Sequence, residues 1–521
     1  MKEQRQLLAR VTTYATADAV NAEGFPAWTP SDETVLEQLA MTGTLGHSFY
    51  RDAQAVMTDA VRLLERADAQ ALAKAIVRGR NEGFMRTFPI LGLVYLSKKD
   101  AALFQSVFNQ VVLTGNDVED FLGFARAVRG LGRSVKRALG RWIQENTSPF
   151  YAQKYRKQLA DAIRVSRFKG EDSIYAYVLQ AYKGVKGNAQ AKVETAYQRY
   201  PVLAAQRDFV AAITAKETAL AYKILQENAL DVNALTAYYG SFDRTLWRAV
   251  AERSPVMRFL KYLAKFVREG VVTQELLDQK LTVAALQKAK VFPFRVYTAY
   301  KALQAEANRF RTTPENAETL EMETVLAHLR KVLNDYAERA DWSLFNGAKW
   351  VIAPDISGSM TSRIGGSSTL TYAAVSAMFV GFFAKGLEDV TILPWNIKVY
   401  EYEVDRERPV VKTIETFTRF VGGGTAMEVA VEYLLRRQVE TDYVVFLTDT
   451  EEYGKGWLKA WKAYHARYPH AVAFVLRGDS YMTSPISEAE AVALNVYQLF
   501  GWNDTVLDYM KFVIATRKML D

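Results

Sequence analysis

The periodicity of the apolar residues changes at about residue 343, and this change limits the folds that the chain can adopt. Before it, apolar residues recur at helical spacing, whereas after it short β-rich runs alternate with helical segments. A chain of 521 residues is also long enough for more than one folding unit. We therefore expect two domains, an all-helical one over 1–342 and an α/β one over 343–521.

The first region is expected to be a stack of helix pairs. In the stretch 101–115, for example, one wide apolar stripe is formed by Leu103, Phe104, Val107, Phe108, Val111 and Val112. Here Asp100 and Asp117 are expected as N-caps and Gly115 as a helix end. No strict sequence period is visible, so irregular HEAT-type repeats and a single compact bundle both remain open. The length favours repeats, because single cores stop growing near this size.

The second region alternates strands with helices. Strands are expected at 350–356, 390–395, 443–449, 471–478 and 496–502, and helices at 370–386, 425–437, 457–468 and 503–519. Such alternation is typical of a Rossmann-like parallel sheet with helices on both faces. The acidic stretch 401–409 is expected to be a solvated hairpin or loop.

Oxygen-bearing side chains follow two of these strands and begin one of these helices. Asp355, Ser357 and Ser359 stand at alternate positions after the first strand, Thr425 begins a helix, and Asp449 follows the third strand. The carboxyl ends of parallel strands meet in one crevice, so the three loops can converge. Oxygen ligands suit a hard divalent cation, with Mg²⁺ the first choice.

The same loops offer little for catalysis. They contain no histidine, cysteine or lysine to act as base or nucleophile, and Glu451 could be either a base or a supporting residue. No GxxxxGK[ST] motif occurs anywhere, so Gly422, Gly423 and Gly424 do not form a P-loop. We expect metal-dependent ligand binding and no enzyme activity. The alternative is that Asp355 and the serines only cap a helix.

Composition excludes several other classes of protein. The chain has no cysteine, and its four histidines form no HxxxH or HxxE pattern. Disulfide scaffolds and thiolate zinc sites are therefore excluded, and a histidine metal site has little support. The start shows no secretory signal, and the longest apolar runs, 89–96 and 373–384, are short for a membrane span. A soluble, cytoplasmic protein that does not enter a membrane is expected.

The net charge of +8 hides an asymmetry between the two regions. Residues 341–521 hold 18 basic and 22 acidic residues, or −4, so 1–340 carry the other 48 and 36, or +12. The excess is concentrated at 121–169, where only Glu145 and Asp161 are acidic. The twelve basic residues there are Arg126, Arg129, Arg133, Lys136, Arg137, Arg141, Lys154, Arg156, Lys157, Arg164, Arg167 and Lys169.

Helical spacing gathers many of these charges onto two faces. Arg133, Lys136, Arg137 and Arg141 share one side of a helix over 132–144, and Arg156, Lys157, Arg164 and Arg167 share one side of the next. Two neighbouring basic faces suit a phosphate backbone, and Tyr151 and Tyr155 could add stacking against bases. The residues expected to bind RNA are Arg129, Arg133, Lys136, Arg137, Arg141, Lys154, Arg156, Arg164 and Arg167. The alternative is that both faces are simply solvated.

Several stretches together resemble the Ro autoantigen family, in which a TROVE module precedes a von Willebrand factor A domain. They are NAEGFPAW (21–28), LAMTGTLGHSFY (39–50), FPILGLVYLS (88–97), LGRSVKRALGRW (131–142), KYRKQLADAIRVSR (154–167), DISGSM, GGGT and LTDTE. The Asp-x-Ser-x-Ser, Thr and Asp set resembles the MIDAS cation site of A domains. The missing cysteines and short termini suit a prokaryotic-type member.

The resemblance implies a ring of HEAT-like repeats closed by the A domain, in a monomeric protein within a ribonucleoprotein. It implies binding of small noncoding Y RNA on the outer surface and of 3′ ends of misfolded noncoding RNA in the central hole. It also implies work with an exoribonuclease such as polynucleotide phosphorylase. The RNA-contacting positions would be Arg133, Lys136, Arg137, Arg164 and Arg167, the last standing where relatives usually have histidine.

Two other functions remain open from the sequence. The first is a protein-interaction adaptor whose A domain binds an acidic partner while the helices have only a structural role. The second is a hydrolase that uses the cation site, although nucleases usually have a richer carboxylate or two-metal cluster.

Overall fold

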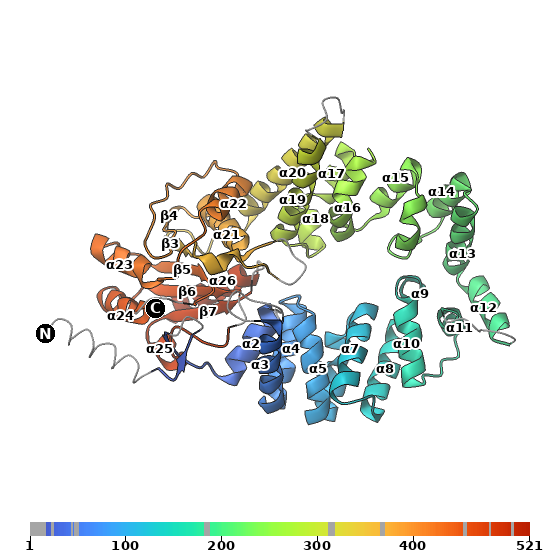
Figure 1. Cartoon of the computed structure of the whole chain (residues 1–521), viewed down its shortest axis with the longest axis horizontal. Coiled ribbons are helices and arrows are strands. Elements are labelled where there is room, and N and C mark those ends of the chain that lie inside the picture. The colour runs from blue at the N-terminus through green and yellow to red at the C-terminus, as the bar shows by residue number, and fades with distance from the viewer. Residues whose placement is uncertain are drawn as a thin grey trace.

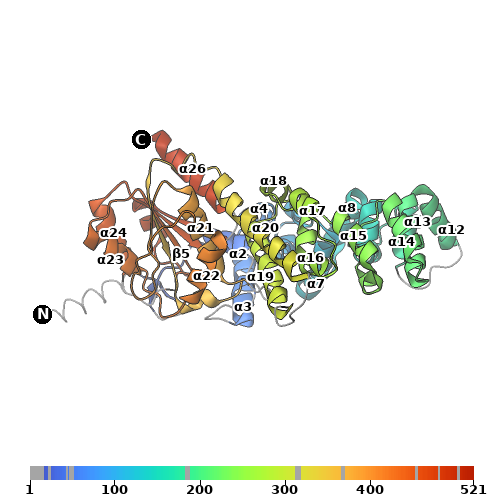
Figure 2. The same ribbon diagram turned by 90° about the horizontal axis from the view of Figure 1, so that it is seen from above.

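The protein is a ring-like assembly. Two rows of helices extend from an α/β domain and join at the opposite end of the molecule (Figure 1). The computed structural model describes residues 17–21, 25–42, 45, 52–181, 188–310, 318–364, 370–451, 456–478, 481–501 and 505–520. Figure 2 shows the same molecule from above, with the helical region extending away from the sheet. None of the described helices is long and apolar enough to cross a membrane.

The first row runs from the α/β domain outward. It begins with two short paired strands, β1 (Ala19–Val20) and β2 (Pro26–Ala27). Its helices are α2 (Asp32–Thr42), α3 (Ala53–Arg66), α4 (Ala69–Asn81), α5 (Thr87–Lys99), α6 (Ala101–Val111), α7 (Gly115–Val128), α8 (Arg133–Asn146), α9 (Pro149–Lys154), α10 (Arg156–Ser166) and α11 (Ile174–Leu179). These helices contribute buried apolar residues to a core that is continuous along the row, and α5 is buried on all sides from Phe88 to Ser97.

Local signals explain where these helices begin, with two corrections. The Asp100 carboxylate accepts hydrogen bonds from the amides of Ala102 and Leu103, as expected of an N-cap. Thr114, and not Asp117, is the N-cap of α7. Asp117 stands three residues later and completes a capping box with it. The expectation that Gly115 ends a helix is wrong, because Gly115 is the first residue of α7.

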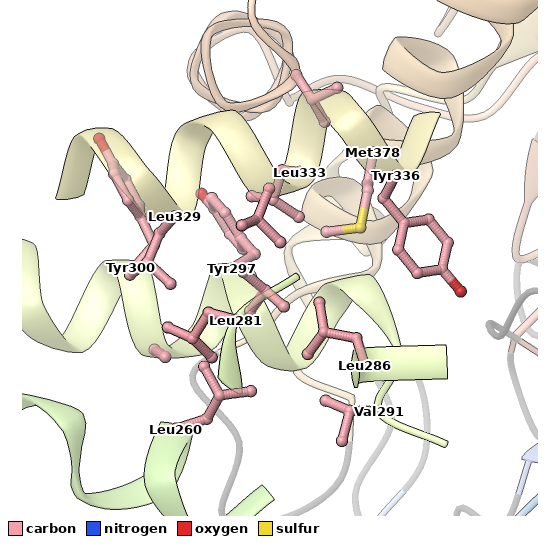
Figure 3. Close-up of a cluster of buried hydrophobic side chains, with 14 of the residues drawn as sticks. Leu260, Leu281, Leu286, Val291, Tyr297, Tyr300, Leu329, Leu333, Tyr336 and Met378 are labelled. Atoms are coloured by element: carbon pink, nitrogen blue, oxygen red, sulfur yellow. The ribbon is translucent and has the colours of Figure 1, made fainter. Parts of the chain in front are cut away.

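The second row returns to the α/β domain after a turn at the far end. The turn and row comprise α12 (Asn188–Arg199), α13 (Pro201–Thr214), α14 (Thr218–Glu227), the 3₁₀ helix η1 (Thr236–Ser241), α15 (Arg244–Arg253), α16 (Val256–Arg268), α17 (Gln274–Lys280), α18 (Val283–Lys288), α19 (Pro293–Phe310) and α20 (Glu318–Arg339). Figure 3 shows part of its core, in which Leu260, Leu281, Tyr297 and Leu333 belong to the same cluster as Met378 of the α/β domain. The second row and that domain therefore share one hydrophobic core.

The α/β domain contains a parallel sheet of the order β4–β3–β5–β6–β7. Its strands are β3 (Lys349–Pro354), β4 (Asp389–Ile392), β5 (Tyr443–Thr448), β6 (Val472–Arg477) and β7 (Val496–Phe500). Its helices are α21 (Tyr372–Gly386), α22 (Val410–Arg419), α23 (Glu428–Arg437), α24 (Trp457–Arg467), α25 (Glu488–Ala493) and α26 (Thr505–Leu520), with the 3₁₀ turn η2 (Gly358–Thr361). The predicted fold class, helical repeats followed by a Rossmann-like domain, is confirmed.

Both ends of the helical region are fastened to the α/β domain. At the first row, Gln38 of α2 donates to the carbonyl of Tyr481 at 2.8 Å, and Trp28 and Ser484 exchange two backbone hydrogen bonds. At the second row, the Asn334 side chain of α20 accepts from the amide of Val410 at 2.9 Å. The segment before α2 thus lies against the α/β domain, although the sequence groups it with the helices.

The two rows also touch each other directly. The ring of Phe84, between α4 and α5, meets the ring of Phe292, before α19, edge-on with centroids 5.1 Å apart. Farther from the α/β domain, the side chain of Gln153 in α9 accepts from the amide of Asp231 at 3.3 Å. These two contacts join the rows at different distances from the α/β domain and hold the rows at a fixed separation.

Candidate functional sites: a cation site and a basic helical surface

The predicted cation ligands begin at the carboxyl ends of two neighbouring strands. Asp355 follows β3 and its amide donates to the carbonyl of Leu447 in β5 at 2.9 Å. The Thr448 hydroxyl, the last group of β5, donates to Asp355 Oδ2 at 2.7 Å. Since Asp449 is the next residue, the parallel pairing of β3 with β5 places both carboxylates at the same edge of the sheet.

The loop after β3 folds back on its own aspartate. Asp355 Oδ1 accepts from the amide of Ser357 at 2.7 Å, and the hydroxyls of Ser357 and Ser359 are 3.1 Å apart. All three side chains are almost completely buried. Alternate spacing therefore puts three oxygen-bearing groups into one tight turn, as the sequence predicts.

The glycine-rich loop completes the arrangement. The amide of Gly358 donates to the carbonyl of Gly423 at 3.0 Å, and the amide of Gly422 donates to the carbonyl of Ile356 at 2.8 Å. Gly423 has a φ of +82°, a conformation that favours glycine. These bonds bring buried Thr425 to the same edge, in the loop before α23 and not inside that helix as the sequence suggests.

The donor set fits a hard divalent cation. It consists of two carboxylates and three hydroxyls, so every ligand atom is an oxygen, and it lies at the carboxyl edge of a parallel sheet. Burial raises the pKa of Asp355, and the hydrogen bonds from Ser357 and Thr448 only partly offset that rise. Among the described residues no three His, Cys, Asp or Glu side chains cluster to hold a metal, so a cation here would depend on the hydroxyl oxygens.

Glu451, which the sequence leaves open as a base or a supporting residue, is buried beside the site. Its amide donates to Asp449 Oδ1 at 3.4 Å, and its carboxylate accepts from the Thr483 hydroxyl at 3.4 Å. Only a small fraction of the side chain reaches solvent. These contacts favour a supporting role, because they hold the loop that carries Asp449.

The predicted basic surface lies on α8 and α10, which pack side by side in the first row. On α8, Arg133 and Arg137 are exposed and Lys136 is half-buried beside them. The opposite face of α8 is buried in the core and comprises Val135, Ala138, Leu139, Trp142 and Ile143. Within the described part of the chain, Arg133, Lys136 and Arg137 form no salt bridge.

The neighbouring helix adds a second group of exposed charges. Lys157, Arg164 and Arg167 are exposed along α10 and at its end. Arg167 is the C-cap residue of the helix and has a φ of +58°. Two adjacent helices thus both expose basic side chains, an arrangement suited to contacts with several phosphates.

Comparisons with known proteins agree with both halves of this architecture. Residues 349–474 match the family model described as the Ro60 vWA domain. The crystal structure of the Deinococcus radiodurans RO (RSR) protein is similar over 93% of this chain and 99% of that one, with a TM-score of 0.61 and 16% sequence identity. No curated protein sequence matches the chain.

The chain has the architecture of a Ro protein. The resemblance seen in the sequence is thus confirmed, by the family model for the A domain and by the fold for the whole chain. The predicted boundary between 342 and 343 falls between α20 and β3, just before the matched range.

Within this Ro-type fold, three of the predicted RNA-binding arginines are occupied by the protein itself. The Arg129 guanidinium donates to the carbonyl and hydroxyl of Ser97, at 2.9 and 2.8 Å. Arg141 donates to the carbonyl of Gln105. Arg156 donates to the carbonyl of Tyr177 at 2.7 and 3.0 Å and stacks on that ring. These three side chains join neighbouring helices of the repeat.

The aromatic part of the prediction is wrong for Tyr155. Tyr155 is buried against Gly115, and the Tyr151 hydroxyl is bound to the carbonyl of Leu113 at 2.8 Å. Neither ring stands free to stack on a base. Lys154 lies over the Tyr155 and Phe150 rings, with its ammonium 5.1 and 5.2 Å from their centroids. Phe150 is the exposed ring of this group.

Two residues that position the cation site were not predicted from the sequence. Thr448 binds Asp355, and Asn396 donates to the carbonyl of Gly422 at 2.8 Å, which holds the glycine-rich loop. Thr448 could have been found, because it directly precedes Asp449 at a strand end. Asn396 follows a different strand and carries no motif, so only the fold connects it to the site.

Proposed function

We propose that this Ro-type chain is an RNA-binding scaffold. The observation that carries the proposal is the solvent-facing set of basic side chains on α8 and α10, in which Arg133, Lys136 and Arg137 have no acidic partner among the residues that the structure describes. Neutralising the phosphates of an RNA releases counterions, which makes such a surface effective and its binding steeply salt-dependent.

The proposed ligands are Y-type stem-loop RNA on this surface and the 3′ ends of misfolded noncoding RNA. The scaffold would act in cytoplasmic RNA quality control, as a monomer within a ribonucleoprotein that works with an exoribonuclease such as polynucleotide phosphorylase. The Ro resemblance and the ring-like course of the helices support this assignment. Single strands bind through backbone charge with little base preference, so an RNA end is a suitable ligand.

A competition assay tests the RNA assignment. One structured RNA is prepared with a 3′ single-stranded tail, with a blunt end and as a circle, and each form competes with a labelled Y-type stem-loop. We expect the tailed form to bind much more tightly than the blunt and circular forms. Equal affinity of the tailed and circular RNAs would contradict capture of a free end.

A second function, cation-dependent binding of an acidic partner, is favoured by the converged oxygens of the A domain. Asp355, Ser357, Ser359, Thr425 and Asp449 would hold Mg²⁺, whose open position would accept a carboxylate oxygen. The loops contain no histidine, cysteine or lysine beside these ligands, and the described Glu451 is buried, so we propose binding without catalysis. RNA cleavage that disappears in Asp355→Ala, and depends on added metal in the unaltered protein, would contradict this.

A further inference from the structure

An apolar pocket of about 250 Å³ lies beside the cation site. It is lined by Ile356, Pro394, Tyr400, Phe417 and Phe420, among others, and we call it the β4-side pocket. Ile356 stands between Asp355 and Ser357, while Pro394 follows β4, the neighbour of β3 in the sheet. The pocket and the proposed cation ligands therefore share one loop and one edge of the sheet.

The rim of this pocket exposes large apolar side chains. Phe420 and Tyr400 both line the pocket and are 68% and 36% exposed. Single exposed hydrophobic residues are common, but two around one hollow make a patch of the kind found at binding surfaces. Ile397, which is 59% exposed, directly follows Asn396, the residue that holds the glycine-rich loop of the cation site.

The charges at this rim indicate the kind of partner. The Lys398 ammonium lies 5.0 Å from the centre of the Tyr400 ring, and Arg419 directly precedes Phe420. Within the described residues neither cation forms a salt bridge, whereas Glu401 of the pocket pairs with Arg437 at 3.5 Å. Positive charge is thus left available for a ligand beside the apolar hollow.

We propose that the β4-side pocket receives a large apolar side chain of a partner protein, whose adjacent acidic side chain reaches the cation site. This inference rests on the proposed cation site and adds the apolar half of the recognition. A protein segment fits better than RNA, because the A-domain half has a net charge of −4 and the stretch 401–409 bordering the pocket is acidic. That overall charge disfavours an extended polyanion, whereas a single carboxylate needs only the local cations.

Fluorescence anisotropy with three labelled hexapeptides tests this proposal. The peptides differ only at their centre, which is Phe-Asp, Phe-Asn or Ala-Asp, and each is titrated with the full chain in Mg²⁺ or in EDTA. We expect Phe-Asp to bind about tenfold more tightly than the other two, since burying one aromatic ring or pairing one carboxylate has about that effect. In Phe420→Ser, the advantage of Phe-Asp over Ala-Asp should disappear. The matched control is Phe512→Ser, which removes a 65% exposed ring from α26.

Each outcome separates the pocket from the cation site. Phe-Asp binding no better than Ala-Asp, or no binding by any of the peptides, overturns the pocket assignment. Binding that needs Phe420 but is equal in Mg²⁺ and EDTA upholds the pocket and contradicts the proposed cation site. If Phe420→Ser instead weakens single-stranded RNA binding and leaves peptide binding unchanged, the occupant is RNA and the proposal is wrong.

Discussion

The basic surface of α8 and α10 and the strand-end site of the A domain are built in opposite ways. The first consists of exposed side chains on the outer faces of ordinary amphipathic helices, whose fold depends on the buried faces. The second consists of buried side chains in loops that are hydrogen-bonded to one another. Asp355, for example, accepts hydrogen bonds from both Ser357 and Thr448. A substitution on the first surface removes only an exposed side chain, whereas a substitution in the second also breaks hydrogen bonds between loops.

This difference predicts how each site should respond to substitution. Contacts between exposed cations and phosphates are nearly independent, so their losses should add and should weaken with salt. Oxygens that surround one ion act together, so loss of one ligand should affect the whole site. The four predictions below test this contrast, in order of decreasing effect.

The largest effect is expected at the buried site. Replacing the carboxylate in Asp355→Ala should weaken Mg²⁺ or Mn²⁺ binding by about a hundredfold or more, because one of only two charged ligands is lost. Isothermal titration calorimetry with the metal alone measures this. Asp389→Ala serves as the control, since it removes an exposed carboxylate at the other end of the sheet. Unchanged affinity in Asp355→Ala would show that the cation, if any, binds elsewhere.

The next effect concerns the basic surface as a whole. Reversing charge at Arg133, Lys136 and Arg137 together should weaken Y-type RNA binding about a hundredfold at moderate salt, at roughly 1 kcal/mol per lost phosphate contact. Filter binding measures the change. A control with the same change of net charge reverses three exposed cations of the far helices, Lys192, Arg248 and Lys261. Equal losses in both triple variants would mean that only overall charge matters.

Two arginines of the predicted set should separate folding from binding. Arg156→Gln removes three hydrogen bonds to α11 and the residue after it, and should lower the free energy of unfolding by about 1–3 kcal/mol. Arg137→Gln removes an exposed side chain and should change stability by less than about 0.5 kcal/mol while weakening RNA binding. Urea titration and RNA binding on both variants give the comparison. Equal stabilities would contradict the structural role of Arg156.

The smallest effect is that of one exposed cation. Arg133→Gln should reduce RNA affinity about fivefold and reduce the slope of log affinity against log salt by about 1. Measuring binding across a series of salt concentrations gives that slope. Lys192→Gln, on α12, should leave the slope unchanged. A full loss of binding from this single change would show that the basic surface acts cooperatively after all.

Much of the A domain could be predicted because its signals are local. Each strand is a short apolar run that ends in a polar loop, and β3–β7 were placed within three residues at their starts and ends. Two helices were not expected, α22 and α25. The sequence of α22, VVKTIETFTR, is rich in β-branched residues, and it forms a helix where Val410 packs against Gly381 of α21. That contact with a distant segment overrides the local preference.

The basic surface shows where sequence reasoning stops. Spacing correctly placed Arg133 and Arg137 on a solvated face, because the buried face of α8 is visible as a stripe. It could not show that Arg129 and Arg141 bind carbonyl groups of Ser97 and Gln105. Those acceptors lie on preceding helices of the stack, and only the packing of one helix pair on the next brings them within reach.

Closure of the ring has a consequence for how the protein is made. Gln38 finds its partner, the carbonyl of Tyr481, 443 positions later in the chain, and Trp28 pairs with Ser484. At about 5–20 residues per second, synthesis of that stretch takes tens of seconds. During this time the first row has left the ribosome while the domain that fastens it does not yet exist. The contacts that fasten α2 and the segment before it to the α/β domain therefore form only when synthesis of the chain is nearly complete.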